Sequence, residues 1–287
     1  MSAEPQPKKS RAGRDLPAAI AVGGLLFGAI VVTLMWWHWG FVLLVAVALS
    51  LGALEVHRAL TRQGMHSAIG VIMVGTAVII IGSYVASRIE HPHIASNTWL
   101  LVALGLTVLA ALGWRMPGGP EGYVKDVAAS LFIIGYVPLL GAFVPLLLAP
   151  PDGGARIICF IMCVMANDIG GYAVGVLFGK HPMAPVISPK KSWEGFAGSA
   201  TFGLLVGAVS VHYLLQAPVW VGLLLGAGLV VSATLGDLTE SLIKRDVGIK
   251  DMSSFLPGHG GIMDRLDSLL VSAPVAWIIL YFLVPTP

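Results

Sequence analysis

The chain has 287 residues, of which 56% are hydrophobic and 11% are charged, and its mean hydropathy is +0.86. Because a soluble domain carries about 25% charged residues, this composition excludes an ordinary water-soluble enzyme and an intrinsically disordered protein. The formal net charge of +2 is too small to bind nucleic acid by bulk charge. The two cysteines, Cys159 and Cys163, lie in one apolar run and predict neither a disulfide framework nor a metal site.

Nine apolar segments are long enough to cross a bilayer core of about 30 Å, which takes roughly 20 residues of helix. The sequence therefore predicts an all-α polytopic membrane protein with nine transmembrane helices. The expected spans are 17–36, 39–57, 68–87, 98–114, 126–149, 155–178, 196–215, 218–236 and 266–284. We divide the chain into a disordered cytoplasmic tail (1–16), scaffold helices (17–150) and a catalytic region (151–287) that holds almost all of the unusual polar residues.

The distribution of basic residues predicts the orientation, because Lys and Arg are enriched on the cytoplasmic side of membrane proteins. Nine spans place the two termini on opposite sides. With a cytoplasmic N-terminus, 15 of the 17 basic residues lie in cytoplasmic segments, and only Arg88 and Arg156 lie outside. We therefore expect a multi-pass protein of the cytoplasmic membrane, with an outside C-terminus and with Trp36, Trp37 and Trp39 as outer anchors.

Asp168 lies within the sixth predicted span, close to Gly170 and Gly171. A carboxylate at the centre of a span costs about 2.5–3.5 kcal/mol on insertion scales. Asp168 is therefore expected to face a water-filled cavity or a partner, and the adjacent glycines favour close approach of a backbone or a ligand. A structural hydrogen bond between helices is the alternative interpretation.

The next loop contains Ser188-Pro189-Lys190-Lys191-Ser192-Trp193-Glu194-Gly195. A Ser-Pro start followed by basic residues and a new helix suits phosphate binding, because the first turn of a helix offers free N–H groups and a positive dipole end. Lys190 and Lys191 would add point charges. Simple anchoring of these lysines at the cytoplasmic surface explains the segment equally well.

The segment after the eighth span is more specific. Four polar residues spaced i, i+3, i+4 and i+7 share one helical face at the cytoplasmic end of that span: Asp237, Glu240, Ser241 and Lys244. The Pro-Gly and Gly-Gly pairs of 257–261 require a tight, non-helical backbone. Asp264 and Asp267 then share one face where the last span begins.

Carboxylates, basic residues and glycine-rich turns thus converge on the cytoplasmic membrane surface. Clusters of oxygen ligands suit Mg²⁺, which keeps waters and is completed by substrate phosphates. Neighbouring basic residues suit phosphate charge, so we predict phosphoryl or nucleotidyl transfer. A transporter would keep its polar residues near the bilayer midplane, often in two related halves, whereas here they gather at one face.

These residues resemble the phosphatidate cytidylyltransferase family, also called CDP-diacylglycerol synthases. The family signature of a serine, Lys-Arg, Lys-Asp, His-Gly-Gly and Asp-Arg-x-Asp is present as Ser241, Lys244, Arg245, Lys250, Asp251, His259, Gly260, Gly261, Asp264, Arg265 and Asp267. The stretch 188–195 is similar to the family's Ser-Pro-Lys-Lys-Thr-Trp-Glu-Gly, with Ser192 in place of threonine. A further family segment is matched by Asp168, Tyr172, Gly175 and 178–180, so the resemblance covers about residues 165–267.

The resemblance implies transfer of the cytidylyl group of CTP to phosphatidic acid, giving CDP-diacylglycerol and pyrophosphate in phospholipid biosynthesis, with Mg²⁺ as cofactor and a homodimer as the assembly. The implied catalytic residues are Asp237, Asp264, Lys244, Arg265 and His259, and the implied metal ligands are Asp237, Asp264 and Asp267. The implied substrate-binding residues are Ser188, Lys190, Lys191, Glu194, Glu240, Ser241, Arg245, Lys250, Asp251, Gly260, Gly261 and Asp168. For His259, a purely structural role within its loop is the alternative.

Three other functions stay open at this point. A related membrane cytidylyltransferase would act on another lipid phosphate, such as that of an isoprenoid ether lipid, because lipid tails contact generic apolar helices. A transporter or channel with a Mg²⁺-binding cytoplasmic gate would move its substrate without releasing pyrophosphate. A catalytically inactive scaffold is disfavoured by the intact carboxylates and basic residues.

Overall fold

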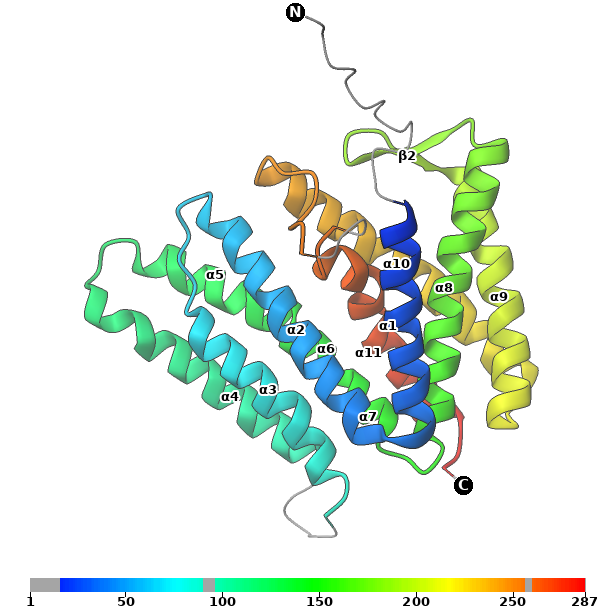
Figure 1. Ribbon diagram of the computed structural model, residues 1–287, viewed down its shortest axis with the longest axis horizontal. Coiled ribbons are helices and arrows are strands. Elements are labelled where there is room, and N and C mark those ends of the chain that lie inside the picture. Colours follow the sequence, from blue (N-terminus) through cyan, green and yellow to red (C-terminus); the bar gives the residue numbers. More distant parts are fainter. Residues whose placement is uncertain (1–15, 90–95, 256–259, 287) are drawn as a thin grey trace, which may run out of the picture.

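The computed structural model describes residues 16–89, 96–255 and 260–286, so the predicted tail over 1–16 lies almost entirely outside the described residues. The chain folds as a set of helices with one short hairpin of two strands (Figure 1). The helices are α1 (Leu16–Trp36), α2 (His38–Thr61), α3 (Ile69–Ala86), α4 (Ser96–Arg115), the 3-10 turn η1 (Met116–Gly118), α5 (Tyr123–Tyr136), α6 (Pro138–Gly141), α7 (Phe143–Leu148), α8 (Gly153–Phe178), α9 (Trp193–Leu215), α10 (Val219–Asp246) and α11 (Met263–Leu283).

Eight helical stretches within the described ranges are long and apolar enough to cross a membrane. They coincide with the eight segments that the sequence predicts from residue 39 onward. Helix α1 coincides with the first predicted segment and is apolar over Gly23–Trp36. The prediction of a helical, multi-pass membrane protein is therefore confirmed.

The fifth predicted span, 126–149, is not one continuous helix. It forms α5, α6 and α7, with breaks at Val137 and Ala142. Pro138 and Pro145 lack the N–H that would continue a helix, and their rings clash with the preceding turn. Val137 accordingly departs from ideal helical geometry, with φ −102° and ψ −71°. The breaks bring α6 and α7 against both α3 and α11.

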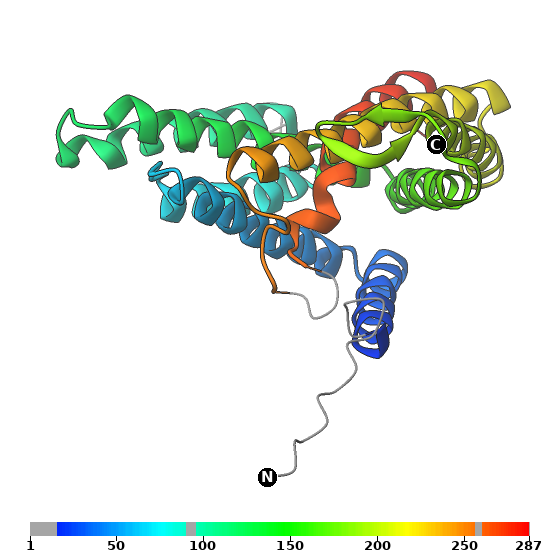
Figure 2. The same ribbon diagram turned by 90° about the horizontal axis from the view of Figure 1, so that it is seen from above.

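The helices form two groups that meet along α11. In the first group α2, α3, α4 and α5 pack on one another, and in the second group α8, α9, α10 and α11 pack in chain order. Helix α11 also contacts α2, α6 and α7. Seen from above, the two groups lie side by side and α1 lies at the edge of the molecule, where it packs mainly against α2 (Figure 2).

Glycines allow the helices of the second group to approach closely. A Cβ added at Gly207 of α9 would lie 2.3 Å from the carbonyl oxygen of Gly222 in α10. Gly170 of α8 and Gly198 of α9 face each other in the same way. A Cβ added at Gly170 would lie 2.7 Å from the carbonyl oxygen of Gly198, and a Cβ added at Gly198 would lie 2.6 Å from that of Gly170. Small residues of this kind let membrane helices bring their backbones together, so α8, α9 and α10 stand at short separations.

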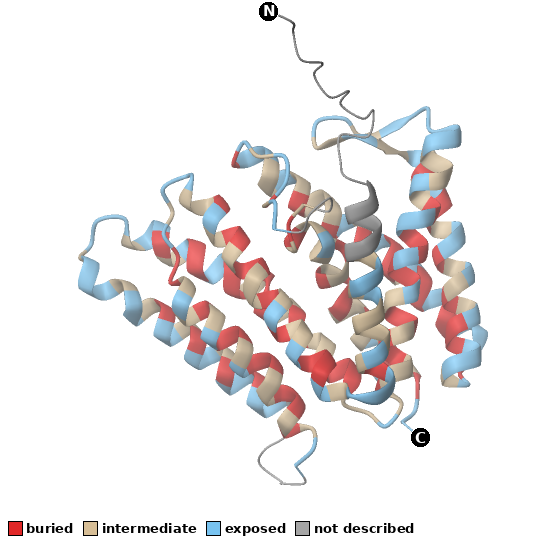
Figure 3. Ribbon diagram, viewed as in Figure 1, coloured by how far each residue is buried: buried red, intermediate tan, exposed pale blue. Residues whose placement is uncertain are grey.

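Buried residues lie where the helices face one another, and exposed residues recur along the outer faces of the helices (Figure 3). Many of these exposed residues are large and apolar. Ile79, Ile133 and Leu225 are 0% exposed in the core, whereas Leu101 and Phe282 are 70% and 72% exposed. A water-soluble monomer rarely exposes so wide an apolar surface. Lipid tails therefore provide a suitable environment for the apolar side chains of this outer surface.

The two strands, β1 (Pro182–Ala184) and β2 (Ser188–Ser192), lie at one end of the helices. Helices α8 and α10 end there, and α9 and α11 begin there (Figure 1). Helix α11 then runs toward the opposite end, where the C-terminus lies. The segments that resemble the family signature therefore gather at one end of the molecule.

Candidate active site

A cavity of about 480 Å³ opens beside the hairpin, with walls from α8, β2, α9, α10 and α11. Residues that lie far apart in the sequence face this one space. The predicted site residues that line it are Asp168, Ser188, Lys190, Lys191, Asp237, Glu240, Lys244, Asp251, Asp264, Arg265 and Asp267. A concave space with convergent polar groups is the usual form of a ligand site.

The hairpin is a departure from the predicted all-α class. Strands β1 and β2 pair in antiparallel orientation. Pro182, Pro185 and Pro189 disfavour a helix in this stretch, because proline lacks an N–H donor and restricts the residue before it. Lys190 and Lys191 therefore lie on a strand beside the cavity.

Helix α9 begins at Trp193, directly after β2. Ser192 is its N-cap, and the Ser192 Oγ accepts a hydrogen bond from the Gly195 N–H at 3.1 Å. A hydroxyl cap satisfies one of the free N–H groups at a helix start. Ser192 and Gly195 both line the cavity, so the positive end of the α9 dipole borders it.

Glu194 attaches the hairpin to the start of α9. Its carboxylate accepts hydrogen bonds from the backbone N–H groups of Lys180 and His181, at 3.1 and 3.2 Å, and lies 2.5 Å from the His181 ring. Glu194 is not among the residues that line the cavity. These contacts indicate a role in positioning β2 and give Glu194 no direct path to a substrate in the cavity.

Lys191 and Asp237 form an ion pair between β2 and α10, with 2.6 Å between Nζ and Oδ2. The two side chains are 23% and 38% exposed, so water reaches the pair from the cavity. Ser241 donates a hydrogen bond from Oγ to Asp237 Oδ1 at 3.4 Å, although Ser241 itself does not line the cavity. The pair places one cation and one carboxylate next to the space that a ligand would fill.

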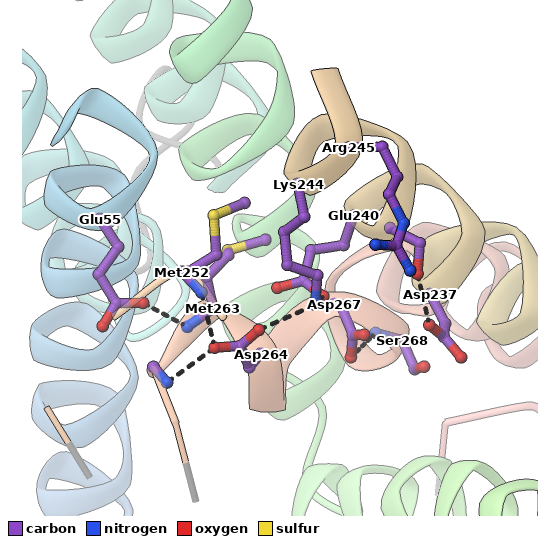
Figure 4. A network of polar contacts seen from close by, with 12 residues as sticks. Glu55, Asp237, Glu240, Lys244, Arg245, Met252, Met263, Asp264, Asp267 and Ser268 are labelled. Carbon is purple, nitrogen blue, oxygen red and sulfur yellow. Dashed lines mark hydrogen bonds and ion pairs between the residues drawn. The ribbon is translucent and has the colours of Figure 1, made fainter. Parts of the chain in front are cut away.

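Helix α10 continues beyond its predicted apolar span to Asp246, and this extension places Asp237, Glu240 and Lys244 on one turn-spaced face. Glu240 is fully buried, and its Oε2 pairs with Lys244. The Lys244 Nζ also lies 2.9 Å from Asp264 Oδ1 of α11. Lys244 thus joins α10 to α11 through Asp264, and its second carboxylate partner, Glu240, lies on α10 itself (Figure 4). Among the described residues, Glu240 Oε1 has no hydrogen-bond partner.

Asp264 also organises the chain that leads into α11. Its Oδ2 accepts hydrogen bonds from the backbone N–H groups of Met252 and Gly261, at 3.0 and 2.7 Å. With Lys244 on Oδ1, both carboxylate oxygens are engaged. The Gly261 N–H is therefore engaged by Asp264.

The backbone explains the glycine pair at this turn. Gly260 has φ +88°, in the left-handed region that glycine adopts without steric cost. A Cβ added at Gly261 would lie 2.6 Å from Glu55 Oε2 and 3.0 Å from Asp264 Oδ2. Gly260 therefore provides the turn, and Gly261 provides the space that lets two carboxylates approach the backbone.

Gly236 allows α10 and α11 to touch at the depth of the cavity. A Cβ added at Gly236 would lie 2.4 Å from the carbonyl oxygen of Asp267. Gly236 directly precedes Asp237, so the close approach brings the carboxylates of Asp237 and Asp267 into one space. Asp168 of α8 lines the same space.

Glu55 of α2 is a polar residue of this region that the sequence analysis missed. It is 4% exposed and accepts hydrogen bonds from Ser253 Oγ and from the backbone N–H groups of Ile262 and Met263. Figure 4 places it on α2, facing the start of α11. A signal was present, because Glu55 is the only acidic residue within the predicted span 39–57.

Besides Glu194, Ser241 and Gly261, three further predicted site residues that the structure describes do not line the cavity. Arg245 is exposed and donates from Nε to the Ile187 carbonyl oxygen at 3.5 Å, and Lys250 is also exposed. Gly260 lies in the turn before α11, outside the lining. His259 lies outside the described residues.

Several cavity residues were not predicted individually as site residues. They share hydroxyl, amide or small side chains on α8, α9, α10 and α11, and they include Asn167, Gly171, Tyr172, Ser199, Thr234 and Ser268. Ser199 donates from Oγ to the Asn167 carbonyl oxygen at 2.8 Å, and the Asn167 amide donates to Asp168 at 3.2 Å. Serine and threonine are common in membrane helices, so their type alone did not mark them.

The cavity suits phosphate and a hard cation by its donor chemistry. Its lining combines six carboxylates with four Lys or Arg side chains. Within residues 16–89, 96–255 and 260–286, no three His, Cys, Asp or Glu side chains converge closely enough to form a ready-made metal site. Mg²⁺ commonly binds through one or two carboxylates, waters and substrate phosphates. The carboxylates here fit that mode of binding.

Comparison with known proteins identifies the family. The model of the cytidylyltransferase family matches residues 17–283. A phosphatidate cytidylyltransferase of Mycobacterium leprae is 42% identical over 289 residues, covering 95% of this chain and 90% of the relative. Phosphatidate cytidylyltransferases of Mycobacterium tuberculosis (strain H37Rv) and Pseudomonas aeruginosa are 42% and 35% identical, covering 98% and 89% of this chain and 87% and 90% of each relative. The chain belongs to the cytidylyltransferase family.

Proposed function

We propose that the protein transfers the cytidylyl group of CTP to phosphatidic acid, forming CDP-diacylglycerol and pyrophosphate. One observation carries the proposal: the carboxylates and cations of the signature line a single cavity at one end of a bundle of apolar helices. Membership of the family over residues 17–283 supports the same reaction.

The position of the cavity suits one water-soluble reactant and one lipid reactant. It lies where α8 and α10 end and where α9 and α11 begin. The ends of membrane-spanning helices are near the headgroups of the lipids, so a phosphate headgroup can reach the cavity from the bilayer. Binding both reactants in one small space removes the entropic cost of their encounter in the chemical step. CTP enters from water, and phosphatidic acid stays anchored by its tails.

In the reaction, a phosphate oxygen of phosphatidic acid attacks the α-phosphorus of CTP in line. A new bond forms between that oxygen and the α-phosphorus, and the bond to the oxygen that bridges toward the β-phosphorus breaks. Pyrophosphate leaves with the bridging oxygen. A phosphate monoester has a second pKa of about 6, so the nucleophile is already an anion and needs no dedicated base. Positioning and charge neutralisation do most of the work.

The cationic side chains have distinct surroundings, which support distinct roles. Lys190 and Lys191 on β2 and Arg265 on α11 border the cavity and are assigned to phosphate binding. Lys191 is paired with Asp237, so a phosphate that binds Lys191 takes the place of the Asp237 carboxylate. Lys244 is held between Glu240 and Asp264 and acts by keeping α10 and α11 in register.

We assign Mg²⁺ to the carboxylates that face the cavity. Asp237 and Asp267 are the preferred ligands, with Asp168 as a further candidate, since all three line one cavity. Asp264 is a weaker candidate, because Lys244 and two N–H groups already occupy its oxygens. When bound, the ion neutralises phosphate charge and orients the triphosphate.

The membrane arrangement follows from the basic residues. We propose nine spans, a cytoplasmic N-terminus and an outside C-terminus, which puts the cavity on the cytoplasmic side of the plasma membrane. Lys190, Lys191 and Arg245, at the cavity end of the helices, agree with that side. The division into scaffold helices (17–150) and a catalytic region (151–287), and the homodimer implied by the resemblance, belong to the same proposal.

The direct test is pyrophosphate release by the purified full-length protein in mixed micelles. Release is expected to require CTP, phosphatidic acid and Mg²⁺ together, and to stop on chelation with EDTA. Replacing CTP by ATP, or phosphatidic acid by diacylglycerol, provides the matched negative controls. Release that is independent of added lipid, or no release under any of these conditions, contradicts the proposal. An isoprenoid ether lipid phosphate in a parallel reaction tests the alternative acceptor.

A further inference from the structure

Glu55 stands apart from the signature in both sequence and structure. It belongs to α2, in the first group of helices, and its side chain is only 4% exposed. An ionisable residue inside a membrane span is costly unless it faces a partner. Within the part of the chain that the structure describes, the groups that donate hydrogen bonds to Glu55 lie about 200 residues further along, in the segment that precedes and begins α11.

The contacts of Glu55 meet the need of a helix start. Oε1 accepts from the Ile262 N–H at 3.0 Å, and Oε2 accepts from the Met263 N–H at 2.8 Å. The first N–H groups of a helix have no partner within the helix, and the N-cap of α11 is Ile262, whose side chain forms no cap. Glu55 therefore provides from α2 the acceptor and the negative charge that a helix N-terminus favours.

Glu55 also holds the segment on the other side of residues 256–259. Ser253 donates from Oγ to Glu55 Oε1 at 2.5 Å and accepts from the Phe255 N–H at 3.1 Å. One buried carboxylate thus fixes the chain both shortly after Asp251 and at the start of α11. Both of these places supply residues to the cavity.

The same turn is held from the opposite side by Asp264. Gly261 lies between the two carboxylates, since a Cβ there would meet Glu55 Oε2 at 2.6 Å and Asp264 Oδ2 at 3.0 Å. Asp264 in turn pairs with Lys244. We propose that Glu55 is a positioning residue for the cytidylyl transfer, which fixes the turn at the start of α11 and thereby the placement of Asp264 and Asp267 in the cavity.

This inference rests on the proposed function and specifies a kinetic consequence. Two of the three cations assigned to phosphate binding are the lysines of β2, and they do not depend on Glu55, because β2 is held by α9 and by Glu194. Only the third, Arg265, lies on the helix whose start Glu55 fixes, so most of the phosphate-binding charge stays in place. Loss of the Glu55 charge is therefore expected to lower kcat by roughly ten- to a hundredfold, the effect of one or two weakened charge-assisted hydrogen bonds. The KM for CTP is expected to change by less than about threefold.

The experiment compares purified full-length wild type, Glu55→Gln, Ser253→Ala and Asp126→Asn. Asp126 is the matched control, because it is a buried carboxylate of α5 (5% exposed) that accepts hydrogen bonds from Arg115 and from the His66 N–H at 2.7 Å each, outside the cavity. Pyrophosphate release gives kcat and KM, and hydrogen exchange reports the amides of Ile262 and Met263. Thermal unfolding in detergent measures stability for all four proteins.

The inference is supported if Glu55→Gln has a low kcat, a near-normal KM for CTP and faster hydrogen exchange at Ile262 and Met263. Ser253→Ala is expected to lose less kcat than Glu55→Gln, and Asp126→Asn is expected to keep a normal kcat. An equal loss of kcat in Asp126→Asn, or wild-type kcat and exchange in Glu55→Gln, overturns the inference. If Glu55→Gln does not fold, Ser253→Ala decides by the same readouts. Absence of pyrophosphate release from wild type refutes the proposed function instead, while the exchange result still tests the placement of the turn.

Discussion

The two groups of helices satisfy their buried polar side chains in different ways. In α3 and α4 of the first group, Thr76 and Thr107 donate to carbonyl oxygens four residues earlier in the same helix, both at 2.7 Å. Such bonds satisfy a hydroxyl locally and do not fix a neighbouring helix. These two hydrogen bonds therefore do not depend on how the neighbouring helices are arranged.

In the second group, the polar side chains connect one element to another. Lys191 joins β2 to α10 through Asp237, and Lys244 joins α10 to α11 through Asp264. Such pairs hold only if the backbones are placed correctly, so they convert helix packing into the geometry of a site. The first group also has one such bond, from Arg115 of α4 to Asp126 of α5, but it lies outside the cavity. Glu55 differs from Asp126 because its contacts reach the second group, at α11. Polar bonds that connect several elements around one cavity indicate where the chemistry lies.

The largest effect is expected for Asp264→Asn, which removes the charge that Lys244 contacts and weakens two backbone hydrogen bonds. Activity is expected to fall by at least about a hundredfold, the usual size for a lost electrostatic element of an active site. Pyrophosphate release measures it, and size-exclusion chromatography in detergent checks that the variant still folds. Wild-type turnover in a folded variant would show that the pair at Asp264 is not part of the site.

A second test separates α10 from α11 with a single methyl group. Gly236→Ala places a Cβ 2.4 Å from the Asp267 carbonyl oxygen, a backbone atom that cannot move aside. We expect a loss of about 1–3 kcal/mol in stability, typical of overpacking, and a fall in activity of roughly tenfold or more. Thermal unfolding and pyrophosphate release are the measurements.

Gly228→Ala is the matched control on the same pair of helices. Its added Cβ would meet only the ends of the Ile279 and Val275 side chains, at 3.0 Å each, and these can rotate. Activity within about twofold of wild type is expected. If both alanine variants behave alike, the close approach at Gly236 has no special role.

A smaller effect is expected for Lys191→Ala, which removes one cation beside the cavity and frees Asp237. The KM for an anionic substrate should rise by roughly tenfold, the size of one exposed charge-assisted contact, with a lesser change in kcat. Steady-state kinetics with CTP and phosphatidic acid varied in turn identifies which substrate is affected. Arg62→Ala, at an exposed position outside the cavity, serves as the control. Unchanged KM values for both substrates remove Lys191 from the binding site.

The smallest effect is expected in the first group. Thr76→Val keeps the shape of a fully buried side chain and removes only its bond to the Ile72 carbonyl oxygen. Activity should stay within about twofold of wild type, because that bond fixes no other helix. A large loss of pyrophosphate release by this variant would break the contrast between the two groups.

Much of the fold was predictable because apolar segments of span length define membrane helices. The breaks near Val137 and Ala142 were less visible, since the stretch 126–149 is apolar throughout and only Pro138 and Pro145 mark them. The hairpin at 182–192 has no alternating pattern, and prolines alone signal that it is not helical. The helical face from Asp237 to Lys244 was predicted by spacing, and the structure confirms the helix.

The candidate site was predictable where one short segment contains its residues. The polar residues of α10 lie within about two helical turns of one another, and Asp264 and Asp267 lie within about two turns of the Gly260-Gly261 pair. At such short separations, the spacing in the sequence indicates which side chains share a face. The contact between Glu55 and Met263 joins residues 208 positions apart, and no periodicity records such a pairing. The ion pair between Lys191 and Asp237 was hidden for the same reason, because it depends on how β2 folds over α10.

Helix α10 is longer than a bilayer requires. Its 28 residues extend for about 42 Å, against a hydrocarbon core of roughly 30 Å. The excess is polar, because the apolar part ends near residue 236 and the last turns carry Asp237, Glu240 and Lys244. A single continuous rod thus extends from the apolar interior into the wall of the cavity, so the polar side chains of that wall need no separate loop to hold them at a fixed height above the lipid-facing turns.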